Sequence, residues 1–477
     1  RGWSDANVSS VVSDSRRVEH GSVFVAFDGL RVRGLDYASA AVERGAIAVL
    51  TDQPCEDLGV PVFQVDSARV AVGRLAAAFH QHPSRSMSVL AVTGTNGKTT
   101  TAVLMAQWLN ATGHRAAAIG TLGTWTADGT TAGSMTTPDA ADLQAELARL
   151  CALGFTHVAI EASSHALDQD RLEGTHIAAA AWLNLSRDHL DYHGDEQTYA
   201  KAKARLFREL LPSGAPAYVN GDDPVCDKMR AEGLAVGWSL GSNADARYQI
   251  AGLRAGRSGI SFQLHAQGET SVQLAAPLLG RHNALNLTVA FLLCRAAGVA
   301  AERLCETAAG LLAPRGRLQP VRNKLGALVL VDYAHTPDAL AHALGVAKSL
   351  LTGAGRLFVV FGCGGDRDRG KRPEMGRIAG NFAHLSVATS DNPRSELPEA
   401  ILAEVEDGLK RSGAARIETL VPSQSLDEDG PHLYLIEADR EQAIRRVVSR
   451  LQSGDVLVVA GKGHETTQTV GETSRPF

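Results

Sequence analysis

Short apolar runs alternate with helical periodicity along most of this chain. Runs of the strand type occupy residues 22–27, 47–50, 89–92, 116–119, 157–161 and 178–185, and later 328–332, 357–361, 385–389, 433–437 and 456–460. Helical patterns cover residues 37–44, 70–79, 98–109, 140–150 and 283–297. This alternation predicts parallel sheets covered by helices on both faces. Three apolar stretches at 248–250, 259–264 and 271–274 lie closer together and predict an antiparallel insert.

Two breaks divide the pattern into three blocks. The first, residues 82–86, is a polar stretch with a proline, and the second, residues 314–317, joins proline and glycine to two arginines. At 477 residues the chain is also too long for one ordinary core. We therefore predict an α/β protein of three domains, over residues 1–86, 87–314 and 315–477.

The sequence VLAVTGTNGKTTTAVL at residues 89–104 carries the clearest chemical signal. A strand-type run leads into a glycine-rich turn, and a helical pattern follows. This order places backbone N–H groups and a helix N-terminus around an anion such as a nucleotide triphosphate. Lys98 can reach the terminal phosphates, and the Thr99 hydroxyl can bind Mg²⁺.

The usual spacing needs glycine at position 92, which is Val92, so this loop is shorter than the common pattern. The alternative is a glycine turn before an ordinary helix. The residues that we assign to the loop are Gly94, Thr95, Asn96, Gly97, Lys98, Thr99 and Thr100.

Composition narrows the class of protein. A hydrophobic fraction of 44% and a charged fraction of 21% are typical of a globular protein. The net charge of −5 gives no support to nucleic-acid binding, and no apolar run approaches the ~20 residues of a membrane span. The first residues lack the apolar segment of a signal peptide. Six cysteines without a C-x-x-C pair indicate buried thiols in a reducing compartment, so we expect a cytoplasmic protein.

Polar residues follow several strands of the second block. Ligands of open α/β sheets bind at the carboxyl ends of strands, so Glu161 and His189 are candidates to hold a divalent ion beside the phosphate loop. Helix capping by Glu161 and a surface role for His189 remain open. Residues 199–207 form a basic helix whose simplest interpretation is a solvated face. Asn283 and Asn286 lie three apart and suit either a base edge or helix capping.

Four strand ends of the third block also carry charge and glycine. They begin at Asp332, Gly362, Asp391 and Gly461. Four such ends in one domain favour a ligand site over ordinary loops.

Together these motifs resemble those of the Mur ligases, the ATP-dependent amide-bond ligases of peptidoglycan precursor synthesis. The resemblance covers nearly the whole chain and rests on residues 94–100, 161–165, 184–191 and 280–283. The Asp-Asn-Pro-Arg turn at 391–394 resembles the branch of the family that adds meso-diaminopimelate. The resemblance implies an N-terminal α/β UDP-binding domain, a central P-loop-type parallel-sheet ATPase domain and a C-terminal Rossmann-like domain for the amino acid. It also leads us to expect further residues after Phe477.

The resemblance further implies which positions meet each substrate. The uridine nucleotide meets Ser15 and the loop after Phe27, although Gly29-Leu30-Arg31 departs from the family's usual loop. The positions for the muramoyl dipeptide are Thr136, Thr137, Ser163, Gln169 and Arg171. Those around adenine, ribose and phosphate are Asn286, Arg317, Asp332 and His335. Those of the diaminopimelate pocket are Arg367, Asp391, Asn392, Pro393, Arg394, Gly461 and Glu465.

Lys203 matches a lysine that the family carries as a carbamate (N6-carboxylysine). Addition of CO₂ turns a cation into a carboxylate able to bind Mg²⁺, and Lys201 is the second choice for this role. The implied metal ligands are Thr99, Glu161, His189 and carbamylated Lys203, and the implied catalytic residues are Lys98, Lys203, Glu161 and His189.

The implied reaction adds meso-diaminopimelate to UDP-MurNAc-L-Ala-D-Glu through an acyl phosphate, with ATP as co-substrate and Mg²⁺ as cofactor. We expect a monomer without nucleic-acid partners or membrane insertion. Two alternatives stay open, namely a folylpolyglutamate synthase-like ligase and a P-loop ATPase that ligates nothing. Amine-dependent phosphate release would separate the second from a ligase.

Overall fold

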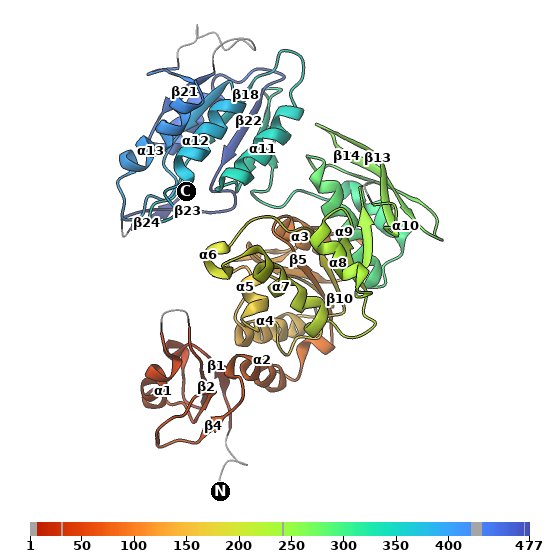
Figure 1. Ribbon diagram of the computed structural model, residues 1–477, viewed down its shortest axis with the longest axis vertical. Helices are drawn as coiled ribbons and strands as arrows, with labels where there is room; N and C mark the ends of the chain where they lie inside the picture. Colours follow the sequence, from red (N-terminus) through yellow and green to blue (C-terminus); the bar gives the residue numbers. More distant parts are fainter. Residues whose placement is uncertain (1–6, 30–31, 241–242, 421–431, 472) are drawn as a thin grey trace. The chain divides into compact units, whose positions relative to one another are not determined.

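A computed structural model describes residues 7–29, 32–240, 243–420, 432–471 and 473–477 (Figure 1). The chain forms two compact units. The first unit contains residues 1–253, 261–276 and 282–311, and the second contains residues 254–260, 277–281 and 312–477.

The first unit opens with a small parallel sheet in the order β1-β2-β3-β4. Its strands and helices are β1 Ser10–Val12, β2 Ser22–Ala26, α1 Ala38–Glu43, β3 Ala48–Thr51, β4 Val62–Gln64 and α2 Ala68–Phe79. One face packs on α2 through Val25, Val72 and Ala76, and Ala140 and Ala141 belong to the same buried cluster.

The central sheet follows in the order β15-β14-β13-β12-β11-β10-β5-β9-β6-β7-β8. Every neighbouring pair from β13 to β6 is parallel, and β7 and β8 continue the β6 edge antiparallel. Its strands are β5 Ser88–Thr93, β6 Ala116–Gly120, β7 Gly123–Thr126, β8 Gly129–Thr131, β9 His157–Glu161, β10 Ala179–Trp182, β11 Ala217–Asn220, β12 Val236–Ser239, β13 Tyr248–Gly256, β14 Gly259–Ala266 and β15 Val272–Ala276. Its helices are α3 Lys98–Ala111, α4 Ala140–Ala152, α5 Ser164–Asp168, α6 Leu190–His193, α7 Glu196–Arg205, α8 Pro224–Ala231, α9 His282–Ala296 and α10 Ala301–Thr307.

The second unit holds a sheet in the order β16-β17-β22-β18-β19-β21-β20, parallel except for β16. Its strands are β16 Gln319–Val321, β17 Leu328–Asp332, β18 Leu357–Phe361, β19 Leu385–Ala388, β20 Ala415–Arg416, β21 Leu433–Ile436 and β22 Val456–Ala460, with the separate antiparallel pair β23 Thr467–Val470 and β24 Thr473–Pro476. Its helices are α11 Pro337–Ser349, α12 Lys371–Phe382, α13 Pro398–Arg411 and α14 Arg440–Val448.

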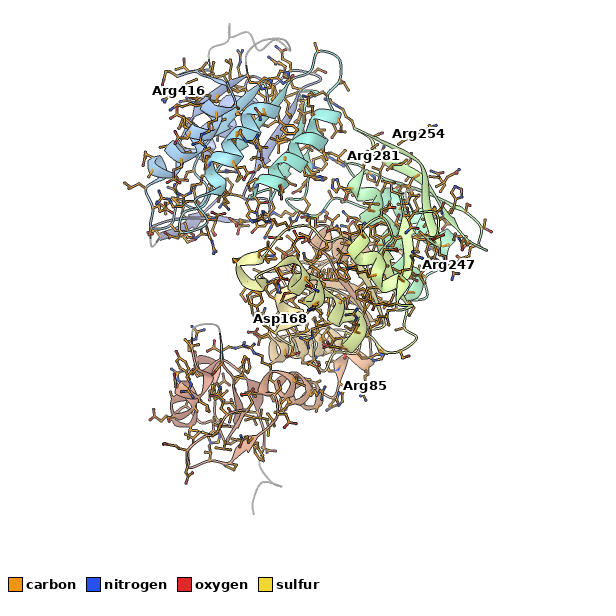
Figure 2. All side chains as sticks on the ribbon, in the orientation of Figure 1. Arg85, Asp168, Arg247, Arg254, Arg281 and Arg416 are labelled. Carbon is orange, nitrogen blue, oxygen red and sulfur yellow. The ribbon has the colours of Figure 1, made fainter. Side chains whose placement is uncertain are left out.

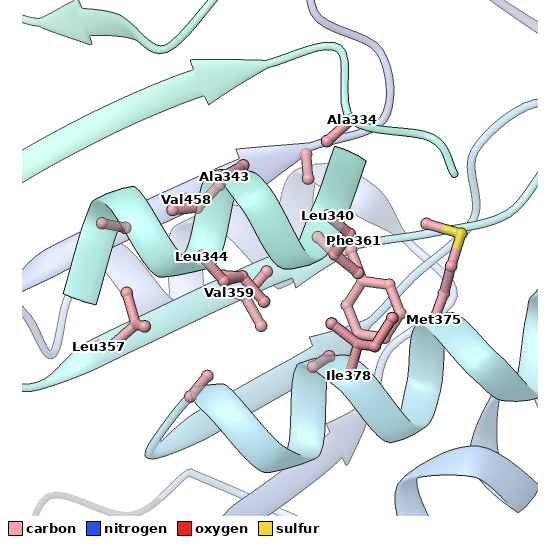
Figure 3. Close-up of a cluster of buried hydrophobic side chains, with 14 of the residues drawn as sticks. Ala334, Leu340, Ala343, Leu344, Leu357, Val359, Phe361, Met375, Ile378 and Val458 are labelled. Atoms are coloured by element: carbon pink, nitrogen blue, oxygen red, sulfur yellow. The ribbon is translucent and has the colours of Figure 1, made fainter. Parts of the chain in front are cut away.

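Both faces of this sheet are buried, which explains the uninterrupted apolar run of β18. Leu357, Val359 and Phe361 point to the face covered by α11 and α12 (Figure 3). Phe358 and Val360 point to the opposite face, in the cluster that includes Ala443 and Val447 of α14. Successive strand residues alternate between faces, so a strand covered on both sides needs apolar residues at every position. Because the strands are fixed by packing on both faces, the residues that directly follow them lie at a fixed edge of the sheet.

The structure revises two expectations. The three strands expected as a separate insert, β13, β14 and β15, are continuous with the central sheet, because β13 pairs parallel with β12. All six cysteines are free thiols, but Cys55, Cys151 and Cys305 are only partly buried. None of the helices in the described ranges combines the length and apolar character required to cross a membrane.

Candidate active site

The phosphate loop connects β5 to α3 at the centre of the first unit's large sheet. Gly94 and Gly97 have φ angles of +151° and +89°, which only glycine adopts without strain. A side chain at position 97 would also overlap Asn286. Lys98 is the first residue of α3, and its Nζ donates to the backbone oxygens of Gly94 (2.7 Å) and Thr95 (2.9 Å). The loop thus combines a helix N-terminus with a lysine ammonium group, and both of these favour the binding of an anion.

Asn184 fixes this loop from the end of β10. Its Oδ1 accepts from the Asn96 backbone N–H (2.9 Å), its Nδ2 donates to the Asn96 carbonyl (3.1 Å), and its own carbonyl accepts from the Thr95 N–H (3.1 Å). These contacts explain why β10 ends at Trp182 rather than at Leu185, because the chain leaves the sheet to hold the loop. Asn184 lies within one of the sequence motifs, but the sequence pattern assigns it no role.

Glu161 ends β9, the strand that neighbours β5, and its side chain is buried. Its Oε2 accepts from the hydroxyls of Thr99 (3.0 Å) and Thr121 (3.2 Å), and its Oε1 accepts from the Thr121 N–H (2.8 Å). Any side chain at Gly120 would overlap this carboxylate. Two of the expected metal ligands, Thr99 and Glu161, are therefore in direct contact.

Lys203 approaches the same loop from α7, and only 1% of it is exposed. Its Nζ donates to the Gly94 carbonyl (2.9 Å) and lies 4.5 Å from the ring centre of Tyr199. Burial lowers the pKa of the Lys203 ammonium well below its ordinary value, and Lys98 lowers it further. Lys201 is exposed on the same helix. The solvated-face interpretation therefore fits Lys201 but not Lys203.

His189 precedes α6, with a left-handed backbone (φ 53°). Its ring centre lies 4.8 Å from that of His165 and 6.2 Å from that of Tyr199. Burial lowers its pKa, Asp188 opposes the shift, and Lys98 and Lys203 add to it. His189 is thus within electrostatic reach of both lysines. Among the residues that the structure describes, no group of three or more His, Cys, Asp or Glu side chains is arranged to hold a metal.

Asn283 and Asn286 bond to each other rather than standing side by side at an open surface. Asn286 Nδ2 donates to Asn283 Oδ1 (2.9 Å), and both side chains are buried in α9. Asn286 also lies against Gly97. In this arrangement α9 supports the back of the phosphate loop.

Residues expected to meet the muramoyl dipeptide gather beside Glu161. The Thr137 hydroxyl donates to the Glu161 carbonyl (2.6 Å) and contacts the Ser163 hydroxyl (3.2 Å). Thr136 joins the group through Thr121, at 3.1 Å between hydroxyls. Arg171 donates to Gln169 Oε1 (2.7 Å) and to the Thr137 carbonyl (3.0 Å).

A pocket extends from these residues to the small N-terminal sheet. Gln169 and Arg171 line it together with Phe27 and Arg69, whose guanidinium lies 4.6 Å from the Phe27 ring centre. Arg69 was not expected from the sequence, because a lone arginine on a helix gives no distinguishing signal. Ser15 lies in the turn at Ser15–Arg17 of the same domain, whereas Leu30 and Arg31 of the expected uridine loop lie outside the described residues. Asp168, labelled in Figure 2, is the last residue of α5. Its carboxylate accepts from the Tyr192 hydroxyl (2.7 Å).

In the second unit, three residues expected to meet ATP surround Tyr333. The Arg317 guanidinium lies 5.0 Å from its ring centre and the His335 ring 4.6 Å from it. Asp332 accepts from the N–H groups of Leu318 (2.7 Å) and Ala334 (2.8 Å), although burial raises the pKa of its carboxyl. Burial lowers the pKa of His335.

The expected diaminopimelate residues form a second group at the ends of β19 and β22. Asn392 Nδ2 donates to Glu465 Oε2 (2.8 Å), and buried Lys462 donates to both Asn392 Oδ1 (3.0 Å) and Glu465 Oε2 (2.9 Å). Burial raises the pKa of Glu465, but these bonds outweigh it and leave the pKa below its ordinary value. Gly461 lies against the Asp391 carboxylate.

The arginines of this group are placed by the neighbouring loop. Arg394 Nη1 donates to the Gly365 carbonyl (2.7 Å), and exposed Arg367 lies beside Gly364. Glu396 accepts two bonds from Arg372 (2.7 and 2.9 Å). A surface pair between Arg394 and Glu396 is therefore not what forms here.

Comparison with known proteins adds to this geometry. Residues 92–294 match the Mur ligase middle domain, residues 316–463 match the glutamate ligase domain of Mur ligases, and residues 7–80 match the catalytic domain of the Mur ligase family. The UDP-N-acetylmuramoyl-L-alanyl-D-glutamate–2,6-diaminopimelate ligase of Rhizobium meliloti (strain 1021) is 41% identical over 98% of this chain and 92% of its own length. The ligase of the same name from Caulobacter vibrioides is 40% identical over 99% of this chain and 94% of its own length.

A solved structure of a UDP-N-acetylmuramoyl-L-alanyl-D-glutamate–2,6-diaminopimelate ligase is similar over the whole chain. Its TM-score is 0.71 at 36% identity, covering 100% of this chain and 94% of the other. The three-domain α/β fold expected from the sequence is the Mur ligase fold. Identity at this level over nearly the full length shows that this chain belongs to the Mur ligase family.

Proposed function

We propose that this protein is an ATP-dependent amide ligase that joins meso-diaminopimelate to UDP-MurNAc-L-Ala-D-Glu in peptidoglycan precursor synthesis. The observation that carries this conclusion is the 41% identity, over 98% of the chain, with a ligase of that name. The geometry of the phosphate loop and of the 391–394 turn supports the division of roles below.

The first step is phosphoryl transfer from ATP. The γ-carboxylate of the D-glutamyl residue attacks the γ-phosphorus, and the bond from that phosphorus to the β,γ-bridging oxygen breaks. The products are ADP and an acyl phosphate on the D-glutamyl residue. Loop amides and Lys98 neutralise charge on the transferring group, which is the main contribution that proteins make to such steps. Asn184 and Asn286 hold the loop in shape for this task.

The residues beside the loop fit a magnesium ion. Mg²⁺ takes oxygen ligands, and the Thr99 hydroxyl and Glu161 carboxylate are in contact there. When bound, the ion would neutralise phosphate charge. We assign His189 and the carbamate of Lys203 to the same ion. A buried lysine with a lowered pKa presents the neutral amine that reacts with CO₂, and the resulting carbamate would replace a cation that repels the metal.

The second step forms the amide bond. The amine of diaminopimelate adds to the acyl carbon, and phosphate leaves from the tetrahedral intermediate. No protein nucleophile is needed, so the residues contribute by positioning the amine and excluding water. We assign Arg394 to the distal carboxylate, because a guanidinium binds a carboxylate through two parallel hydrogen bonds.

The remaining expected residues keep their assignments as part of this proposal. Thr136, Thr137, Ser163, Gln169 and Arg171 would bind the dipeptide, with Ser15 on the uridine side, and Arg317, Asp332 and His335 would meet ATP. We also propose a cytoplasmic monomer, in line with six free thiols, which are typical of a reducing compartment.

Phosphate release tests the function directly. The protein is incubated with ATP, Mg²⁺ and UDP-MurNAc-L-Ala-D-Glu, with and without meso-diaminopimelate. We expect release that depends on both the nucleotide sugar and the amine, with formation of the tripeptide product. Release without either would indicate a simple ATPase, and activity on a folate instead would indicate a folylpolyglutamate synthase.

A further inference from the structure

Strand β23 runs along the 391–394 turn and holds it at successive positions. The Gln468 side chain donates through Nε2 to the Asp391 carbonyl (2.7 Å), and the Thr469 N–H donates to Asn392 Oδ1 (2.9 Å). The Arg394 N–H donates to the Thr469 carbonyl (3.2 Å), and the Gly471 N–H donates to the Arg394 carbonyl (2.7 Å). The turn that carries the pocket's polar groups is therefore shaped by a strand some 75 residues further along the chain.

Arg394 needs this support because its backbone is strained. Its φ angle is +52°, in the left-handed region that non-glycine residues rarely adopt. Strain of this kind persists only where surrounding contacts impose it, and it concentrates at functional sites. Here both backbone groups of Arg394 are bonded to the segment 469–471.

Gln468 is the side chain that joins the strand to the start of the turn. It is 6% exposed, and both ends of its amide are bonded, because Oε1 accepts from Arg475 Nη2 (3.2 Å) on the partner strand β24. The Asp391 carbonyl requires a donor at this place. A glutamate would bring a negative charge against that carbonyl, and an apolar side chain would leave it without this bond.

The Arg394 guanidinium takes its direction from the turn rather than from a neighbouring acid. One N–H group bonds to the Gly365 carbonyl, while the nearby Glu396 is occupied by Arg372. Within the described ranges Arg394 forms no ion pair. A shift of the turn would therefore move the guanidinium relative to any carboxylate that it binds.

We propose that Gln468 is a positioning residue that sets the selectivity of this site for an amino acid with a second, distal carboxylate. It acts on the substrate only through the backbone of the Asp-Asn-Pro-Arg turn and the direction of Arg394. The proposal rests on the assignment of Arg394 to the distal carboxylate of diaminopimelate.

The test compares Gln468→Met with the wild type. Methionine keeps the length and volume of glutamine but cannot donate to the Asp391 carbonyl. Gln468→Glu removes the same donor and adds a charge. Gln442→Ala, at an exposed glutamine of the same unit, is the matched control. The readouts are KM and kcat for meso-diaminopimelate, KM for ATP, the rate with L-lysine, and the midpoint of thermal unfolding.

We expect both Gln468 variants to raise the KM for meso-diaminopimelate about ten-fold, by analogy with the loss of a buried polar contact. The preference for meso-diaminopimelate over L-lysine should fall, whereas the KM for ATP and the control variant should match the wild type. An unchanged diaminopimelate KM in Gln468→Met would overturn the inference, and so would equal losses for ATP and diaminopimelate. Failure of the wild type to use diaminopimelate at all would instead contradict the proposed function, and this inference with it.

Discussion

Lys203 is a lysine placed where an ammonium group is disfavoured. It is buried, it bonds to the Gly94 carbonyl, and Lys98 adds a second positive charge close by. A lysine whose surroundings lower its pKa in this way is a candidate for a functional role rather than a purely structural one. The carbamylation that we propose would resolve this conflict, because it would convert the amine into an anion beside the phosphate loop.

We predict that Lys203→Ala is inactive and regains part of its activity when short carboxylates such as formate or acetate are added. The reason is that the carbamate contributes its negative charge, which a small carboxylate can replace, and not the aliphatic chain that carries it. Initial rates of phosphate release with increasing acetate measure this effect. Lys201→Ala, two residues earlier and exposed, is the control and should be active without additives. Full activity of Lys203→Ala would refute the role, and rescue of Lys201→Ala would move it to that residue.

Lys98 leads to a second prediction about the phosphate loop. Its ammonium group lies on the loop carbonyls of Gly94 and Thr95 at the N-terminus of α3. Removal of a cation that stabilises a transferring phosphoryl group typically costs 10²-fold or more in rate, so Lys98→Ala should lose ligation. Steady-state kinetics would count against this account if more than about a tenth of the wild-type activity remained.

Residues that follow a strand in a chemically distinctive run can be proposed as site residues from the sequence, as Lys98 and Glu161 were. Residues that act across the fold could not. Asn184 contacts the loop from 88 positions away, and Gln468 reaches Asp391 from 77 positions away. Neither contact leaves a local pattern, because each depends on which strands become neighbours.

At the scale of elements, α12 is joined to the loops around it by one fully buried arginine. Arg372 binds Glu396 through two bonds and Glu404 through a third (3.0 Å). Both acids lie at or near α13, so this cluster ties α12, α13 and the segment after the 391–394 turn together.

We predict that Arg372→Ala lowers the free energy of unfolding of the second unit by about 1.5–3 kcal/mol, because the charge-assisted hydrogen bonds of a buried guanidinium to two partly exposed carboxylates are lost. Calorimetric unfolding measures this change. Arg369→Ala is the matched control, since Arg369 also pairs with Glu404 but is largely exposed, and its loss should cost much less stability than the loss of Arg372. If the two variants lost equal free energy of unfolding, burial would not be what determines the contribution of the Arg372 ion pairs.

We expect His157 to make the stability of the central sheet depend on pH. It begins β9, its Nδ1 lies 2.8 Å from the Thr156 hydroxyl, and its ring packs 4.5 Å from that of His114. Burial lowers its pKa below the ordinary 6.5 and His114 adds to this, while a bond with the Ala297 backbone opposes it. Between 6.5 and the lower folded value, the unfolded chain binds a proton that the folded chain does not.

The contribution of His157 to stability is complete above pH 6.5 and is lost as the pH falls below it. We therefore predict that His157→Gln weakens the dependence of the unfolding midpoint on pH between 7 and about 5. The exposed His20→Gln is the control. An unchanged slope in His157→Gln would contradict the assignment.

Elements buried on both faces were the most predictable from the sequence. Leu328–Asp332, Leu357–Phe361 and Val456–Ala460 appear as strands with the expected bounds. Shorter elements were missed, including β1 with three residues and the hairpin of β7 and β8, whose polar and glycine residues resemble a loop. Their strand form comes from pairing with a neighbour, which no local pattern records.

At the scale of the whole molecule, alternating strands and helices established the α/β class, but strand order required the structure. β5 lies between β9 and β10, which brings Glu161 and Asn184 to either side of the phosphate loop. In the second unit, β22 lies between β17 and β18, so the ends at Asp332 and Gly461 are neighbours although more than a hundred residues separate them. Sequence order alone does not contain either adjacency.

In the mechanism that we propose, this ligase selects meso-diaminopimelate through Arg394. L-lysine lacks the distal carboxylate and would bring its ammonium group to the guanidinium, and a site built for a polar partner rejects an analogue without it by up to ~10⁴-fold. The most direct measurement is kcat/KM for meso-diaminopimelate and for L-lysine, with ATP and UDP-MurNAc-L-Ala-D-Glu, in the wild type and in Arg394→Ala. The account predicts a strong preference for meso-diaminopimelate in the wild type, and in Arg394→Ala a KM for it raised by at least about ten-fold with ATP affinity retained. Equal use of L-lysine by the wild type, or unchanged diaminopimelate kinetics in Arg394→Ala, would contradict it.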